Sequence, residues 1–454
     1  MRLRLEIGLA RLAGRLSRLA ARGGGTTLPG KFLVAVDPGA LATLAERLPH
    51  GAALVSATNG KTTTAAMTAE ILGRRVRLAH NRAGANLVSG VASALLDADG
   101  AELGLFEVDE AAFPEVARRV RPRVVTLGNL FRDQLDRYGE LELVAERWRA
   151  LVRELPEEVR LVVNGDDPQI GALAGERSGT VVFGVDDPAQ ARGGGLQHAA
   201  DSKHCVRCGT PYTFRAAYVG HLGDYECPAC RHRRPPLELA ARSIALDGLD
   251  GASFDLDAPE GTQRIRLRLP GLYNVYNALA AAALSRALGA SLDEIAVGLG
   301  RFAAAFGRFE RIVVGDRRLL MLLIKNPAGA NEAIRTLVSG GAPSLALVAL
   351  NDAIADGKDV SWIWDVDFEP LLEGLERVVV TGDRAAELAL RFKYAGFDAR
   401  AIEVLPPLER GLDRALALTP PGHELIILPT YTAMLALRRI VARRGHVPQY
   451  WEAA

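Results

Sequence analysis

The sequence predicts an α/β protein of more than one domain. Short apolar runs typical of β-strands alternate with longer stretches of helical periodicity, which predicts a mostly parallel sheet with covering helices. The alternation restarts after Ile312, so we expect a domain boundary near residues 311–316. The length of 454 residues also suits several domains, at roughly 100–200 residues each.

Composition narrows the functional class. Apolar residues make up 49% of the chain, charged residues 24%, and the formal net charge is +1. These values argue against a disordered tail protein and against a general polyanion binder. We find neither a run of about 20 uncharged apolar residues nor a secretory signal, and therefore expect a cytoplasmic protein.

Residues 1–48 are predicted to form a basic amphipathic helix and a lead-in. Leucines recur at four-three spacing, and arginines flank them. The leucines are Leu5, Leu9, Leu12, Leu16 and Leu19, and the arginines are Arg4, Arg11, Arg15, Arg18 and Arg22. Such a helix either lies on the anionic inner face of a membrane or packs its leucines on the body of the protein.

Residues 49–312 are predicted to form a nucleotide-binding domain. Strands are expected at 52–56, 103–108, 124–127, 160–163 and 180–183, with further strands returning to the sheet within 237–269. Helices are expected at 65–72, 111–119, 141–155 and 274–288. Residues 313–454 are predicted to form a second, Rossmann-like domain, with strands near 318–323, 345–350, 377–381 and 425–428.

The loop after the first predicted strand carries the chemistry of a phosphate site. It reads Thr58-Asn59-Gly60-Lys61-Thr62-Thr63 and precedes a predicted helix. In that setting backbone N–H groups face a phosphate, Lys61 can reach the β- and γ-phosphates, and Thr62 can offer its hydroxyl to Mg²⁺. Val55 stands where the usual first glycine of the motif would be. The alternative is a tight polar turn.

Glu107 ends an apolar run in Phe106-Glu107-Val108-Asp109-Glu110. The carboxyl ends of strands are where an open α/β sheet binds ligands, and a carboxylate there suits Mg²⁺ held together with phosphates. An exposed acidic loop is the alternative interpretation.

Residues 193–236 contain two CxxC pairs, formed by Cys205, Cys208, Cys227 and Cys230. Four thiolates at this spacing predict a closed tetrahedral Zn²⁺ site in a small inserted ribbon, with a structural role. Reduced thiols without metal are the alternative. The neighbouring residues 231–234 are either solvated or in contact with an anionic ligand.

Several motifs in order resemble the Mur ligase family. They are the loop at 58–62, Glu107 with its neighbours, and the segments 128–138, 163–167 and 271–278. The resemblance implies a central ATPase domain, a Rossmann-like C-terminal domain, and the joining of an amine to a carboxylate through an acyl-phosphate made from ATP.

Departures from ordinary Mur ligases point to one branch. Gln134 and Tyr273 stand where these ligases usually have histidines. The segment Leu322-Leu323-Ile324-Lys325-Asn326-Pro327 replaces the usual Asp-Tyr-Ala-His-x-Pro. Between residues 167 and 203 there is no lysine that could be carbamylated. These features, the four cysteines and the segments 81–86, 306–311, 351–365 and 429–434 resemble the MurT family, the Mur-ligase-like subunits of lipid II isoglutaminyl synthase. That resemblance implies a heterodimer with a GatD-type glutaminase subunit and amidation of the D-glutamate α-carboxylate in lipid II.

The resemblance also implies roles for particular residues. Lys61 and Thr62 would hold phosphates and Mg²⁺, Glu107 would hold Mg²⁺, Asn277 would face the adenine, and Arg308 would meet the nucleotide from across the cleft. An aspartate in the 352–359 loop would complete the Cys-His triad of the glutaminase. Asp356 and Asp352 are the leading candidates for it, and Asp359 is the third.

Two other functions remain open from the sequence. One is a Mur-type or folylpolyglutamate-type ligase that adds an amino acid, which should show no ATP turnover with ammonium as the only amine. The other is a zinc-stabilised ATP-binding subunit with a purely regulatory role.

Overall fold

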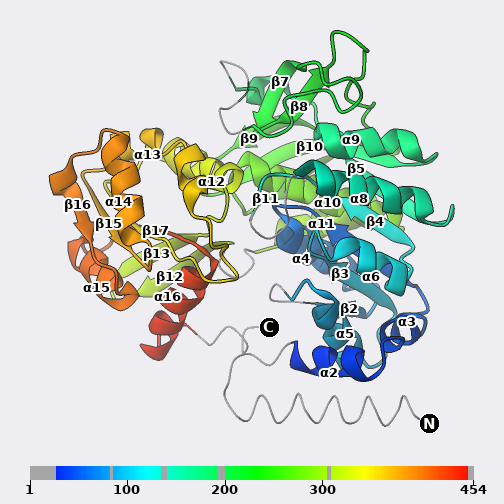
Figure 1. Cartoon of the computed structure of the whole chain (residues 1–454), viewed down its shortest axis with the longest axis horizontal. Helices are drawn as coiled ribbons and strands as arrows, with labels where there is room; N and C mark the ends of the chain where they lie inside the picture. The colour runs from blue at the N-terminus through cyan, green and yellow to red at the C-terminus, as the bar shows by residue number, and fades with distance from the viewer. Residues whose placement is uncertain are drawn as a thin grey trace.

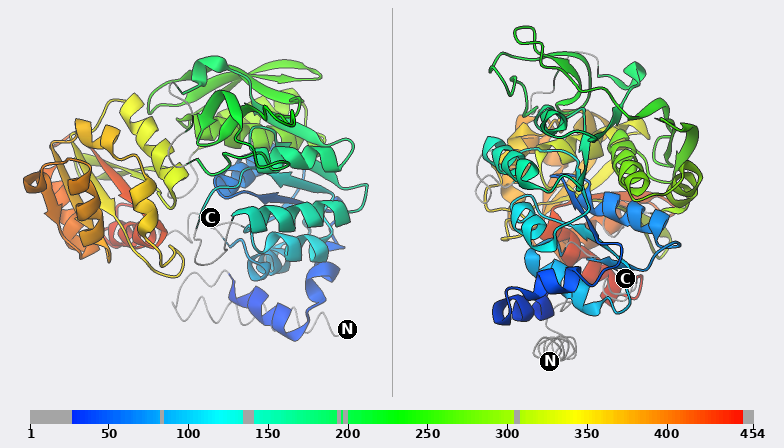
Figure 2. Two further views of the ribbon diagram at one scale, coloured as in Figure 1. Left: turned by 45° about the horizontal axis from the view of Figure 1, so that its top comes forward. Right: turned by 90° about the vertical axis from the view of Figure 1, so that its right-hand side faces the viewer.

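The computed structural model describes residues 27–81, 85–133, 141–192, 196, 200–303 and 308–447. Within them the chain forms two α/β bodies side by side, with a small β-hairpin region above the first (Figures 1 and 2). The predicted basic helix lies within residues 1–26, outside the described residues. None of the described helices is long and apolar enough to cross a bilayer.

The first body is built on a nine-stranded sheet of order β11-β10-β9-β6-β5-β4-β1-β3-β2. All of its pairings are parallel except those of β10, which runs antiparallel to β9 and β11. Its strands are β1 (Ala52–Ser56), β2 (Leu78–His80), β3 (Leu103–Glu107), β4 (Val124–Leu127), β5 (Arg160–Asn164), β6 (Val181–Val185), β9 (Leu239–Leu246), β10 (Ala252–Ala258) and β11 (Gly261–Leu267). The predicted mostly parallel sheet is therefore confirmed.

Helices cover both faces of this sheet because successive strand side chains point to opposite faces. Ala53 and Val55 pack with α4 (Lys61–Leu72), α10 (Leu272–Ala287) and α11 (Leu292–Arg301). Leu54 packs on the other side. That face is covered by α2 (Leu28–Val36), α3 (Ala40–Ala45), α5 (Val88–Asp97), α6 (Phe113–Val120) and α8 (Leu141–Glu154), and the short helix α9 (Pro168–Gly171) follows β5.

The second body is a six-stranded sheet of order β12-β13-β17-β14-β15-β16. Its strands are β12 (Arg308–Val314), β13 (Arg317–Leu322), β14 (Leu345–Ala349), β15 (Arg377–Thr381), β16 (Ile402–Val404) and β17 (Glu424–Pro429). One face carries α12 (Pro327–Ser339), the 3₁₀ turn η3 (Ser361–Asp365), α13 (Glu369–Gly374) and α14 (Ala385–Tyr394), and the other carries α15 (Leu408–Leu418) and α16 (Tyr431–Arg443).

The predicted boundary between residues 312 and 313 falls inside β12. This strand pairs antiparallel with β13, so the change from one sheet to the other lies before Arg308. The hairpin of β7 (Thr213–Val219) and β8 (Leu222–Glu226) lies in the predicted insertion, between β6 and β9.

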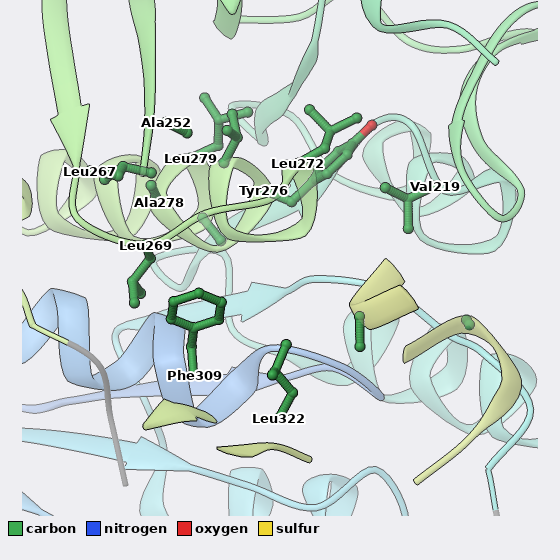
Figure 3. Close-up of a cluster of buried hydrophobic side chains, with 14 of the residues drawn as sticks. Val219, Ala252, Leu267, Leu269, Leu272, Tyr276, Ala278, Leu279, Phe309 and Leu322 are labelled. Carbon is green, nitrogen blue, oxygen red and sulfur yellow. The ribbon is translucent and has the colours of Figure 1, made fainter. Parts of the chain in front are cut away.

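One apolar cluster runs through both bodies. Figure 3 shows Phe309 and Leu322 of the second body facing Leu269 and the helix that carries Tyr276. The two bodies are therefore joined across buried side chains, and a cleft opens along this junction.

Candidate functional site

The site begins at the carboxyl end of β1, where the 58–63 loop leads into α4. Gly60 has a φ of +87°, a conformation that favours glycine. A Cβ there would lie 1.9 Å from Oδ1 of Asn277, so α10 also leaves no room for a side chain. The loop therefore follows α10 closely, and its backbone amides stand at the N-terminus of a twelve-residue helix.

Lys61 is 6% exposed, and its Nζ lies 3.0 Å from Glu110 Oε2 and 2.9 Å from the carbonyl oxygen of Ala57. Burial by itself lowers the pKa of Lys61, but the nearby carboxylates of Glu110, Glu107 and Asp109 outweigh it and raise the pKa. The lysine is therefore charged and points back along its own loop.

Two predicted Mg²⁺ ligands are buried, one in the 58–63 loop and one at the end of β3. Thr62 Oγ1 is buried and has no hydrogen-bond partner among the described residues. Glu107 is 2% exposed and ends β3, directly opposite Val55 in the pairing of β1 with β3. Asn81 fixes it through hydrogen bonds to the backbone N–H (2.9 Å) and carbonyl (2.7 Å) of Glu107. A hydroxyl without a partner and a buried carboxylate are both oxygen ligands of the kind that Mg²⁺ prefers.

Of the two other residues predicted to bind the nucleotide, the structure places the side chain of Asn277 but not that of Arg308. Asn277 is 7% exposed, lines the cleft and donates to Asn274 Oδ1 at 3.1 Å. Arg308 begins β12, but its side chain lies outside what the structure describes. The roles assigned to both residues stay predictions.

The second wall of the cleft comes from the C-terminal body and was not predicted from sequence. Lys325 Nζ donates to the carbonyl oxygen of Thr58 at 3.0 Å and to Asp133 Oδ2 at 2.5 Å. Asn326 and Asn59 exchange side-chain hydrogen bonds of 3.0 and 3.3 Å. The segment that replaces the usual C-terminal motif thus contacts the 58–63 loop, so both bodies contribute residues to the cleft.

The hairpin of the insertion also reaches the cleft. Val219 and Leu222 line it together with Phe131, whose backbone N–H donates to Thr58 Oγ1 at 3.1 Å. The buried ring of His221 packs on Phe131 with a centroid distance of 4.5 Å. The predicted ribbon is therefore part of the cleft wall, a role that residue spacing alone does not reveal.

Phe309 enters the cleft from a strained backbone. Its φ is +68°, and the pairing of β12 with β13 shifts register between Arg308 and Glu310. A bulge of this kind re-aims a side chain, and here it leaves the Phe309 ring 6% exposed against the other body.

The four cysteines come together as predicted. Their sulfurs all lie within 4.8 Å of one another, with 3.5 Å between Cys205 and Cys230 and 3.4 Å between Cys208 and Cys227. Tetrahedral Zn–S bonds of about 2.3 Å require sulfurs a little under about 4 Å apart, so the donor set fits Zn²⁺. Arg234, near the end of the ribbon, forms an ion pair with Asp166 at 3.1 Å, so its charge is engaged within the protein.

The three candidate triad aspartates follow β14, and each is held by the C-terminal body. Asp356 is 6% exposed and accepts hydrogen bonds from the backbone N–H (2.8 Å) and the hydroxyl of Thr432. Asp352 pairs with Arg384 at 3.2 Å. Asp359 is exposed and accepts from the Ser361 N–H at 2.8 Å. Burial raises the pKa of Asp356, whereas the Ser361 hydrogen bonds lower that of Asp359.

Comparison with known proteins gives consistent matches. Residues 55–223 match the Mur ligase middle domain, and residues 323–434 match the family described as MurT ligase C-terminal. The lipid II isoglutaminyl synthase (glutamine-hydrolyzing) subunit MurT of Streptococcus pneumoniae is 33% identical over 98% of both chains, and that of Staphylococcus aureus strain N315 is 31% identical over 96% of both. Among solved structures, a pseudomurein peptide ligase type C from Methanothermus fervidus superimposes with a TM-score of 0.71 at 21% identity, covering 89% of this chain and 80% of its own.

Proposed function

The chain belongs to the MurT family of Mur-ligase-like enzymes, and from this premise we propose that it amidates the D-glutamate α-carboxylate of lipid II at the expense of ATP. The observation that supports this most directly is the cleft in which Lys61 of one body and Lys325 of the other meet at the carbonyl oxygen of Thr58. Two cations at a helix N-terminus suit a phosphoryl group in transfer.

A carboxylate does not react with ammonia until it carries a leaving group. In our proposal the γ-phosphoryl group passes to the substrate carboxylate, and the acyl-phosphate is then attacked by ammonia. Lys61 and the 60–63 amides bind the phosphates, while Thr62 and Glu107 would hold Mg²⁺, which neutralises charge on the phosphates. Apolar residues of the cleft, Phe131 and Phe309 among them, exclude water that would hydrolyse the acyl-phosphate.

We propose that ammonia comes from a GatD-type glutaminase subunit. The glutamine-hydrolyzing activity named for the relatives supports this, and the 352–359 loop offers carboxylates at the end of a strand in the second body. Ammonia also explains the loss of the segment that ordinary Mur ligases carry at 322–327, because the nucleophile has no carboxylate of its own to be bound.

The test is amide formation by the purified chain with ATP, lipid II and ammonium as the only amine. Lys61→Ala should abolish the product and nucleotide-dependent stabilisation, because the phosphates lose a buried charged donor. Lys31→Ala, at an exposed position on α2, is the matched control and should leave both unchanged. Product that forms only with an added amino acid would instead favour an amino-acid ligase.

A further inference from the structure

We infer that Asp133 is a catalytic base for the amide-forming step and accepts the proton that the attacking nitrogen must lose. The inference rests on the proposed function and adds a residue to it. It starts from one carboxylate oxygen, Asp133 Oδ1, which is buried and has no hydrogen-bond partner among the described residues. The whole Asp133 side chain is 6% exposed.

Asp133 lies where the two bodies meet at the phosphate loop. Its other oxygen, Oδ2, accepts from Lys325 Nζ at 2.5 Å, and the same ammonium group donates to the carbonyl oxygen of Thr58 at 3.0 Å. Lys61 Nζ lies 3.4 Å from that carbonyl oxygen. A phosphoryl group between the two lysines would therefore lie next to Asp133. Lys325 occupies Oδ2 of Asp133, which leaves Oδ1 available.

The charges around Asp133 favour a role as proton acceptor. Burial raises its pKa, and the negative charge of Glu110 adds to that effect, while Lys325 and Lys61 oppose it without cancelling it. A buried carboxylate is a better base than an exposed one, and the lysine on Oδ2 fixes its orientation.

The chemistry requires such an acceptor. The ammonia lone pair forms the C–N bond, and the nitrogen then bears a positive charge and one proton too many. That proton passes to Asp133 Oδ1 as the C–O bond to phosphate breaks, so that amide and inorganic phosphate leave and the protonated Asp133 returns its proton to water. Atoms and charge balance without a further reactant.

Glu332, which lines the cleft, is a second buried carboxylate with an unpartnered oxygen and serves as a comparison. Glu332 Oε2 is also buried without a hydrogen bond among the described residues, but Arg192 binds Oε1 and Arg335 Nη1 lies 3.8 Å from Oε2. A guanidinium group thus faces each oxygen of Glu332, so both oxygens are already paired with a cation. Glu332→Gln is therefore the matched variant for Asp133→Asn.

The experiment compares two nucleophiles in the full chain with ATP and lipid II. Asp133→Asn keeps the shape and the acceptor for Lys325 but cannot take a proton. We expect amide formation from ammonium to fall by about 10²-fold or more. Hydroxamate formation from hydroxylamine should fall far less, because this weakly basic nitrogen loses its proton to water readily once it is attached to the acyl carbon.

The outcomes distinguish a proton acceptor from a residue that only positions Lys325. Asp133→Glu should recover part of the ammonium reaction, and Glu332→Gln should change both reactions by the same factor. If Asp133→Asn lowers both reactions equally, Asp133 only positions Lys325, and the inference is wrong. If the unaltered chain forms no amide from ammonium, the proposed function fails instead.

Discussion

At the scale of single residues, the three aspartates of the 352–359 loop differ in how far they are already engaged. Thr432 occupies both oxygens of Asp356, whereas the side chain of Asp352 is 26% exposed beside Arg384. A carboxylate that orients a histidine of another subunit has to be accessible at the surface. Asp352 and Asp359 are therefore better candidates for this role than the buried Asp356.

This difference is testable by changing Asp352, Asp356 and Asp359 to Asn in turn. If one of them orients the imidazole of a glutaminase subunit, as proposed, its Asn variant should lower glutamine-dependent amidation by up to about 10⁴-fold, because that imidazole would be misoriented. High ammonium should restore its product. Glu107→Gln is the contrasting control and should fail with either nitrogen source. If all three Asn variants lose both activities, the loop belongs to the synthetase site.

Asp166 predicts a pH dependence of stability. Burial raises its pKa to about 6, although Arg234 and Tyr276 bond to it. The unfolded chain has an Asp pKa of about 3.9, so the folded state binds the proton more tightly. The contribution to the free energy of unfolding is therefore greatest below about pH 4 and falls, by roughly 3 kcal/mol in all, as the pH rises through about 6.

Urea titrations between these pH values measure that slope. It should be smaller in Asp166→Asn than in the unaltered chain, whereas Asp316→Asn, at an exposed position, should keep it. Equal slopes in all three proteins would show that Asp166 does not titrate in this range.

The local geometry of the 58–63 loop could be predicted because its residues are neighbours in sequence. The 58–63 loop follows a strand and precedes a helix, so spacing alone places Lys61 at a helix N-terminus. Lys325 is 267 residues from Thr58, and its contact depends on how two sheets meet, which no local pattern encodes. The bulge that turns Phe309 inward was equally hidden, because its strand pairing is not evident from the chain.

At the scale of elements, most strands of the two sheets were predicted, whereas several helices of ten or more residues were not, α12 and α16 among them. β2 and β16 have three residues each, which leaves too little periodicity to recognise. The inserted ribbon was predicted from cysteine spacing, but its hairpin contact with Phe131 was not.

The ribbon should bind one Zn²⁺ per chain. Cys205→Ser should lower the melting temperature more than it lowers the activity of the protein that stays folded, because a closed four-cysteine site contributes folding free energy. Arg207→Ala, at an exposed position in the same ribbon, is the control and should leave the melting temperature nearly unchanged. Metal analysis that finds no zinc in protein purified without chelator would contradict the prediction.

At the scale of the whole molecule, polar contacts close the two bodies over the cleft. Arg192, which precedes the ribbon, pairs with Glu332 of α12, and Arg335 of α12 donates to the carbonyl oxygen of Tyr218 at 3.0 Å. Arg132 lies 3.5 Å from Asp365 of η3. These contacts accompany the shared apolar cluster and favour the closed arrangement.

Removing one of them should open the molecule. Arg192→Met leaves Glu332 buried without its nearest partner, so we expect weaker ADP binding and a larger radius of gyration by small-angle X-ray scattering. Arg215→Met, on the exposed side of the ribbon, should change neither value. An unchanged radius of gyration in Arg192→Met would mean that the apolar cluster alone holds the bodies together.

The ribbon hairpin touches Phe131 on one side and α12 on the other, and this double contact has a thermodynamic consequence. Free energies of binding at two linked sites are reciprocal, so if the four cysteines hold a metal that strengthens nucleotide binding, nucleotide must strengthen metal binding by the same factor. Chains with nucleotide bound would then retain their metal longest. In a cell short of zinc, idle copies of the enzyme would release the ion first, and working copies would keep it.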